Sequence, residues 1–182
     1  MMSQERRVRV LIDEDQIARR NHEIALEIAK REPKQLLLVA ILKGSFMFAA
    51  DLMRALHHAG LMPQVEFMHL SSYRDATVSS GQVVILKDVE SDVRDRDVIL
   101  IDDILESGRT IAFAKDLLAA RGARVLTCCL LEKPGKRAVS VKADFVGFTC
   151  PDLFVVGYGM DVAHSYRQLP FIGVVEMDDE QA

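Results

Sequence analysis

Two wholly apolar segments, each followed by a helical pattern, constrain the fold of this chain more than any other feature of its sequence. Residues 36–42 read LLLVAIL and residues 98–101 read VILI. A strand that carries only apolar side chains must be buried on both faces, which is characteristic of parallel sheets covered by helices. The two segments therefore predict an α/β fold with a mainly parallel, twisted sheet flanked by helices.

Further strands and helices alternate along the chain. Apolar periodicity predicts three helices, at residues 14–31, 46–60 and 109–121. Asp13 can cap the start of the first helix, and Gly60 and Gly122 mark the ends of the second and third. Strands are expected at residues 35–42, 64–72, 82–89, 97–102 and 124–132, and short strand-like runs at 143–148, 153–160 and 171–176. The order strand–helix–strand occurs twice, which predicts right-handed crossovers and places ligands at the carboxyl ends of the strands.

Length and composition limit the possible classes of protein. The 182 residues favour one domain, and a net charge of −4 gives no electrostatic footprint for nucleic acid. No apolar run approaches the roughly 20 residues of a membrane span, and no signal-peptide pattern opens the chain, so we expect a cytoplasmic protein. The three cysteines lack the spacing of a metal site and are expected to be buried thiols.

Acidic residues stand directly before a predicted anion-binding turn. Asp102 and Asp103 follow the second apolar run, and residues 106–110 read ESGRT just before a helical pattern. A helix start presents free N–H groups and a partial positive charge, which together bind phosphate. The alternative is a plain capped turn with solvated acids. Neither a Walker loop nor a dinucleotide fingerprint is present, and GYG at 157–159 is too short to count as one. The pattern suggests a ligand with a phosphate at one end and hydroxyls or metal-bound oxygens at the other, such as a phosphorylated ribose.

The segment VILIDDILESGRT resembles the phosphoribosyl-diphosphate motif of type I phosphoribosyltransferases. Four more segments resemble, in the same order, parts of hypoxanthine-guanine phosphoribosyltransferases: AILKGSFMFAADL, SSYRD, KADFVGF and LFVVGYGMDVAHSYRQLPFIG. The resemblance implies a single domain over residues 1–182. Its core would span about residues 36–140, and the N- and C-terminal segments would form a small hood over the base site.

The resemblance also implies roles on the sugar and diphosphate side. Asp102 and Asp103 would bind the ribose hydroxyls, and both, with Asp161, would stand near Mg²⁺. The turn of Glu106, Ser107, Gly108, Arg109 and Thr110 would hold the 5′-phosphate. Lys43 and Gly44, joined by a cis peptide in the family, would bind pyrophosphate together with Arg167. Ser72 and Tyr73 would belong to a mobile loop that closes over the diphosphate and keeps water out.

On the base side, the resemblance implies a carboxylate near purine N7, which makes Glu106 the catalytic candidate. The family usually has aspartate there, so this chain has one extra methylene, about 1.5 Å of reach. Lys142 would donate to the 6-oxo group of the purine, which favours a 6-oxopurine over adenine. Phe154 would stack on the ring, the Val155 backbone would read its edge, and Met160 would pack beside it.

The function implied is purine salvage: transfer of a phosphoribosyl group from phosphoribosyl diphosphate to N9 of hypoxanthine or guanine, possibly xanthine, with Mg²⁺ as cofactor. A homo-oligomer, dimer or tetramer, is expected by the same resemblance. An adenine-specific enzyme is disfavoured by Glu106 and Lys142. A regulatory nucleic-acid-binding relative is disfavoured by the net charge of −4. A non-catalytic nucleotide sensor stays open because of Glu106.

Overall fold

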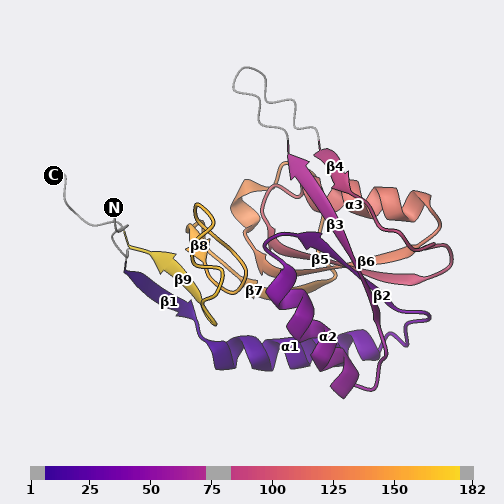
Figure 1. Ribbon diagram of the computed structural model, residues 1–182, viewed down its shortest axis with the longest axis horizontal. Helices are drawn as coiled ribbons and strands as arrows, with labels where there is room; N and C mark the ends of the chain where they lie inside the picture. The colour runs from indigo at the N-terminus through magenta and orange to yellow at the C-terminus, as the bar shows by residue number, and fades with distance from the viewer. Residues whose placement is uncertain (1–6, 73–82, 177–182) are drawn as a thin grey trace.

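A six-stranded sheet forms the centre of the molecule in the computed structural model, which describes residues 7–72 and 83–176 (Figure 1). Its strands lie in the order β4-β3-β2-β5-β6-β7. Their bounds are β2 Leu37–Leu42, β3 Gln64–Ser72, β4 Val83–Lys87, β5 Asp97–Leu105, β6 Arg124–Glu132 and β7 Phe145–Thr149. All neighbouring pairs are parallel except β3 and β4. The predicted α/β class with a mainly parallel sheet is confirmed.

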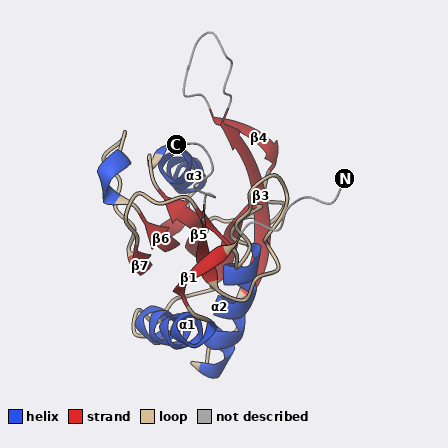
Figure 2. Cartoon of the chain, turned by 90° about the vertical axis from the view of Figure 1, so that its left-hand side faces the viewer, coloured by secondary structure: helices blue, strands red, loops and turns tan. Residues whose placement is uncertain are grey.

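Helices cover both faces of this sheet (Figure 2). The helices α1, Glu14–Ala29, and α2, Phe46–His58, pack on one face, and α3, Arg109–Ala120, packs on the other. The strand β2 serves both layers: Leu38 and Ala40 join the core under α1 and α2, while Leu37 and Val39 join the core under α3. Burial on both faces explains why this strand contains no polar residue.

A second, three-stranded sheet joins the two ends of the chain. It has the order β1-β9-β8, with β1 at Val8–Ile12, β8 at Val155–Val156 and β9 at Ile172–Val175. Its strands are antiparallel, and Val8 pairs with Val175. The sequence-based prediction did not include β1, although its residues VRVLI contain the β-branched Val8, Val10 and Ile12, which are typical of strands.

Two boundaries differ from the prediction. The strand β5 does not end at Asp102 but runs on to Leu105, because its pairing with β6 continues to Leu105 opposite Glu132. Of the expected strand at 153–160, only Val155 and Val156 form β8, and Gly157 pairs with Met160 across the turn of Tyr158 and Gly159. The three cysteines are buried and unpaired in disulfides, and burial raises the pKa of Cys129 to about 12. Within residues 7–72 and 83–176, no helix is long and apolar enough to cross a membrane.

Candidate active site

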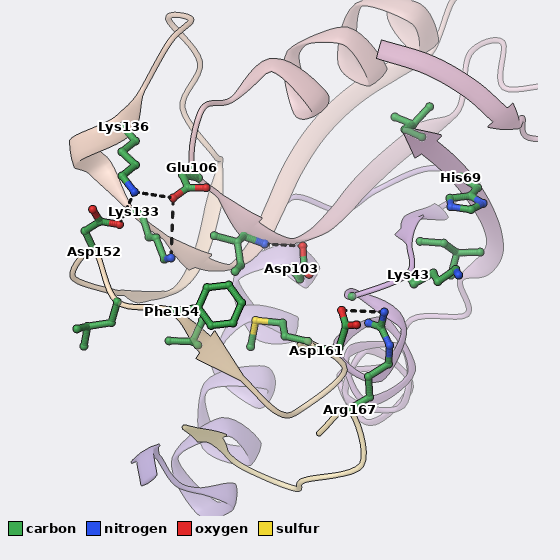
Figure 3. A pocket seen from close by; sticks show the side chains of 17 residues that line it. Lys43, His69, Asp103, Glu106, Lys133, Lys136, Asp152, Phe154, Asp161 and Arg167 are labelled. Atoms are coloured by element: carbon green, nitrogen blue, oxygen red, sulfur yellow. Dashed lines mark hydrogen bonds and ion pairs between the residues drawn. The ribbon is translucent and has the colours of Figure 1, made fainter. Parts of the chain in front are cut away.

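A cavity of about 640 Å³ opens at the carboxyl edge of the central sheet, between that edge and the segment around β8 (Figure 3). Its size suits a small ligand such as a nucleotide. Segments that are far apart in the sequence line it: Leu42, Lys43, Gly44, His69, Leu70, Asp103, Ile104, Glu106, Lys133, Lys136, Asp152, Leu153, Phe154, Val155, Met160, Asp161 and Arg167. Charges of both signs meet there, which suits a ligand with anionic groups and hydroxyls.

The two adjacent acids of β5 have different surroundings. Asp103 lines the cavity, whereas Asp102 is only 7% exposed and does not line it. An Asp102 carboxylate oxygen accepts a hydrogen bond from the Asp103 backbone N–H at 3.0 Å. Burial, and then the nearby Asp103 carboxylate, raise the pKa of Asp102 well above its usual range. Asp103 is therefore the acid that a ligand in this cavity meets first.

The loop after β2 approaches Asp103 very closely. A Cβ atom added to Gly44 would lie 1.7 Å from Oδ2 of Asp103, so no larger residue fits unless that carboxylate moves. Lys43, the first residue after β2, lines the cavity and has an exposed side chain. The cis peptide bond lies between Leu42 and Lys43. The expected cis bond between Lys43 and Gly44 is therefore wrong by one position.

The predicted phosphate turn stands at the start of α3. Gly108 is the N-cap residue of that helix, with a left-handed φ of +81°. The Ser107 backbone carbonyl accepts hydrogen bonds from Ala138 and Val139, and its hydroxyl accepts one from the Arg109 N–H at 3.4 Å. Of the five turn residues only Glu106 lines the cavity, and the other four lie beside it.

Glu106 points toward two lysines that follow β6 (Figure 3). Its Oε1 atom lies 3.9 Å from Nζ of Lys133 and 3.7 Å from Nζ of Lys136. Lys136 also pairs with Asp152 at 2.9 Å, and that hydrogen bond raises the pKa of Lys136. The Glu106 side chain is thus directed by two cations toward the part of the cavity that Lys133 lines.

The structure does not bring Lys142 into the cavity. The Lys142 side chain is exposed, and its carbonyl accepts a hydrogen bond from Thr127, in the middle of β6. Residues that precede the parallel strand β7 lie toward the amino ends of the strands, away from the ligand edge. Lys133 follows the carboxyl end of β6 instead; its side chain is 9% exposed and lines the cavity. The lysine that lines this part of the cavity is thus Lys133, not Lys142.

The remaining base-side predictions do meet in the cavity. Phe154 is 62% exposed, unusual for a phenylalanine, and its ring faces the cavity near Lys133. Val155 and Met160 line the same space and are 5% and 3% exposed. An exposed ring above a cavity leaves one aromatic face free to stack on a ligand.

Comparison with known proteins gives the family. The model of the phosphoribosyl transferase domain matches residues 11–163. Over 177 residues the chain is 42% identical to hypoxanthine phosphoribosyltransferase of Salmonella typhimurium, covering 95% of this chain and 98% of the relative. The chain belongs to the hypoxanthine phosphoribosyltransferase family. It is also 42% identical to hypoxanthine-guanine phosphoribosyltransferase of Bacillus subtilis, with 92% and 93% of the two chains covered. The structure of Trypanosoma cruzi hypoxanthine phosphoribosyltransferase in complex with the product IMP superposes with a TM-score of 0.86 at 33% identity, covering 97% of each chain.

The residues predicted to bind diphosphate and Mg²⁺, among them Lys43, Asp161 and Arg167, line the same end of the cavity (Figure 3). Arg167 pairs with Asp161 at 2.9 Å and donates to the Gly159 carbonyl at 2.6 Å. Asp161 also accepts a hydrogen bond from the His164 N–H at 2.8 Å. Of the two predicted loop residues, Ser72 is the last residue of β3, and Tyr73 lies outside the described residues.

The donor set of the cavity fits Mg²⁺ only as a shared ion. Asp103 and Asp161 line the same space, yet no group of three or more acidic, histidine or cysteine ligands occurs within the described part of the chain. Magnesium is commonly held by one or two carboxylates together with substrate phosphates. These residues therefore suit an ion that arrives with a phosphorylated substrate.

The sequence-based prediction gave no role to four polar residues that line the cavity: Lys133, Lys136, Asp152 and His69. For Lys133 a signal existed, because it comes directly after the apolar strand β6, as Lys43 comes after β2. His69 lies inside β3 and Asp152 in an irregular loop, where no periodicity distinguishes them from ordinary polar residues.

Proposed function

We propose that the protein transfers the 5-phosphoribosyl group of phosphoribosyl diphosphate to N9 of hypoxanthine or guanine, giving IMP or GMP and pyrophosphate. The observation that carries this proposal is the single cavity in which Asp103, next to the phosphate turn, faces Lys133 and Phe154. The relatives named above catalyse this type of reaction, which disfavours a non-catalytic nucleotide sensor. The biological role would be purine salvage in the cytoplasm.

On the sugar side, Asp103 would accept hydrogen bonds from a ribose hydroxyl, with Asp102 supporting it from behind or reaching the second hydroxyl after a small shift. The turn from Glu106 to Thr110 would hold the 5′-phosphate by its backbone N–H groups. Lys43, Gly44 and Arg167 would bind the pyrophosphate oxygens. Mg²⁺, held between the substrate and Asp103 or Asp161, would neutralise charge on the leaving diphosphate when bound.

On the base side, Lys133 takes the role that the sequence reading gave to Lys142. Its ammonium group only donates hydrogen bonds, so it favours a 6-oxo group over the 6-amino group of adenine. Phe154 would stack on the ring, the Val155 backbone would read the ring edge, and Met160 would pack beside it. Glu106, held on this side by Lys133 and Lys136, would accept or share the proton at N7.

Two further parts of the proposal concern the chain as a whole. We propose a single phosphoribosyltransferase domain over residues 1–182 that forms a homo-oligomer, dimer or tetramer. Ser72 and Tyr73 would belong to a loop that closes over the diphosphate during turnover, because an oxocarbenium-like ribosyl centre hydrolyses if water reaches it. Light scattering after size exclusion measures the oligomeric state directly.

The experiment that tests the function is a base panel. The purified protein is incubated with phosphoribosyl diphosphate, Mg²⁺ and each of hypoxanthine, guanine, xanthine and adenine, and the nucleotide formed is measured. Turnover of 6-oxopurines without turnover of adenine is the expected result. Tight binding of phosphoribosyl diphosphate with no nucleotide from any base would contradict the proposed reaction and favour a sensor.

A further inference from the structure

The turn at residues 157–159 has an unusual backbone. Gly157, Tyr158 and Gly159 all have left-handed conformations, with φ values of +92°, +48° and +97°. Glycine adopts such angles readily, but for a bulky residue such as tyrosine they are an outlier. A conformation of this kind persists only where the surroundings hold it in place. The contacts of the Tyr158 side chain are therefore expected to fix the position of residues 157–159.

The Tyr158 side chain is held by both helices on the α1–α2 face of the sheet. Tyr158 is 4% exposed, and its hydroxyl donates to Oδ2 of Asp51 in α2 at 2.7 Å. The same hydroxyl accepts a hydrogen bond from Nδ2 of the buried Asn21 in α1 at 2.9 Å. Among the described residues, these are the only hydrogen bonds that join residues 157–160 to α1 or α2. A single hydroxyl thus connects the turn to the helical layer.

The other side of the turn touches the active-site cavity. A Cβ atom added to Gly159 would lie 2.4 Å from the carbonyl oxygen of Gly44, so the turn lies directly against the loop that contains Lys43. Arg167 donates to the Gly159 carbonyl, and the next two residues, Met160 and Asp161, line the cavity. The turn stands where the base side and the diphosphate side of the cavity meet.

The helix α2 connects the anchor to the diphosphate side as well. It begins at Phe46, immediately after the Lys43–Gly44 loop, and the buried Ser45 hydroxyl donates to the Ile41 carbonyl at 2.6 Å. Asp51 lies in this same helix, less than two turns after its start. A hydrogen bond from Tyr158 to Asp51 therefore fixes Met160 and Asp161 relative to the start of α2 and the loop before it.

We propose that the Tyr158 hydroxyl is a positioning group: through Asp51 and Asn21 it holds the 157–159 turn so that Met160 and Asp161 face the Lys43–Gly44 loop at the correct distance. Tyr158 would not touch substrate, because its hydroxyl lies on the far side of the turn from the cavity. The inference rests on the proposed function, and it adds that binding of base and of diphosphate are coupled through this one hydrogen-bonded side chain.

The first variant to make is Y158F, which keeps the ring and removes only the hydroxyl. Expected are a kcat/KM about tenfold lower, since small displacements of binding groups are costly in catalysis, and a raised KM for both substrates. Y166F is the matched control, because Tyr166 belongs to the same segment and does not line the active-site cavity. It should retain wild-type kinetics.

Variants of the partner separate the hydrogen bond from the charge. D51N keeps an acceptor oxygen for the hydroxyl and should stay within about twofold of wild type. D51L removes one of the two partners of the hydroxyl and should lower kcat/KM by less than Y158F, which removes both hydrogen bonds. The double variant Y158F/D51L should be no worse than Y158F alone, because Y158F already removes the hydrogen bond to Asp51. Asp51 also pairs with Arg54 at 2.7 Å, so R54M measures that contribution separately.

Two outcomes would overturn the inference. One is a Y158F protein with a lower melting temperature but unchanged kcat and KM, which would reduce Tyr158 to a packing role. The other concerns amide hydrogen exchange in the substrate-free protein. The Tyr158 and Gly159 N–H groups donate to the Leu169 and Arg167 carbonyls, and their exchange should be faster in Y158F. Unchanged exchange would contradict the anchoring itself, even if the wild-type protein made no nucleotide and the proposed function failed.

Discussion

The half of the cavity proposed to bind the sugar phosphate and the half proposed to bind the base are constructed in different ways. The first comes largely from one continuous segment, in which Asp103 lies on β5 and the turn at 106–110 leads directly into α3. The second is assembled from segments that are distant in the sequence: Lys133 follows β6, whereas Phe154 and Met160 flank the short strand β8. In a continuous motif, the residues that line the cavity are close together in the sequence. In an assembled site, their positions depend instead on which strands are neighbours in the sheet.

The largest effect that tests this contrast is expected for the base-side lysine. K133M should lower kcat/KM for hypoxanthine about 100-fold, because it removes a buried donor aimed into the cavity. K142M is the matched control, since Lys142 is exposed and remote from the cavity, and it should change kcat/KM by less than about twofold. Steady-state kinetics of both variants measure this. A larger loss of kcat/KM in K142M than in K133M would assign the base-binding role to Lys142 and contradict the proposed role of Lys133.

The next effect tests the sugar–phosphate half. In G44A the new Cβ atom would lie 1.7 Å from the Asp103 carboxylate and must displace it, so kcat/KM for phosphoribosyl diphosphate should fall by about 50-fold. G135A, near the base half, is the control, because a Cβ atom there meets nothing within 4 Å. Equal activities of the two variants would show that Asp103 tolerates displacement.

A smaller effect is expected from the aromatic ring. F154L should raise the KM for hypoxanthine roughly tenfold, since stacking on an aromatic ring contributes about 1–3 kcal/mol per base. The melting temperature should stay nearly unchanged, because Phe154 is 62% exposed and supports little of the core. Kinetics and thermal unfolding of the same preparation measure both quantities. A large loss of stability with an unchanged KM would assign Phe154 to packing.

The smallest effect concerns the residue that belongs to both halves. E106D keeps the charge and shortens the side chain by about 1.5 Å, and we expect a change in kcat/KM of less than about threefold. The isosteric control E106Q removes the charge and should lower kcat/KM about tenfold or more. If E106Q keeps full activity, the Glu106 carboxylate does not accept the proton from N7, and another group of the cavity must do so.

The same contrast explains how much could be predicted from sequence. The mainly parallel character of the central sheet and the turn before α3 were predictable because the apolar run of β2 and the motif that spans the end of β5 are local patterns. The purine-binding role was predicted for Lys142, which does not line the cavity. Two lysine-containing segments, residues 133–137 and 139–144, follow β6, and periodicity does not tell which of them lies at the carboxyl edge of the sheet. The hydrogen bond from Thr127 to the Lys142 carbonyl decides this, and it depends on tertiary structure.

The extra methylene of Glu106 was also visible in the sequence, but its consequence was not. The two lysines that attract the carboxylate, Lys133 and Lys136, stand more than twenty residues away, after β6. Likewise Tyr158 appeared only as part of a short GYG sequence. Its partners, Asn21 and Asp51, come from the first third of the chain, so no local pattern could have linked them.

The pairing of β1 with β9 has a consequence for the order in which the protein matures. During synthesis the amino-terminal half of a chain emerges first and folds as soon as its partners are available. The six-stranded sheet is complete once β7, which ends at Thr149, has left the ribosome, whereas β1 must wait for β9 at Ile172–Val175. We therefore expect a nascent chain to acquire the platform for the sugar phosphate before it acquires an enclosed place for the base.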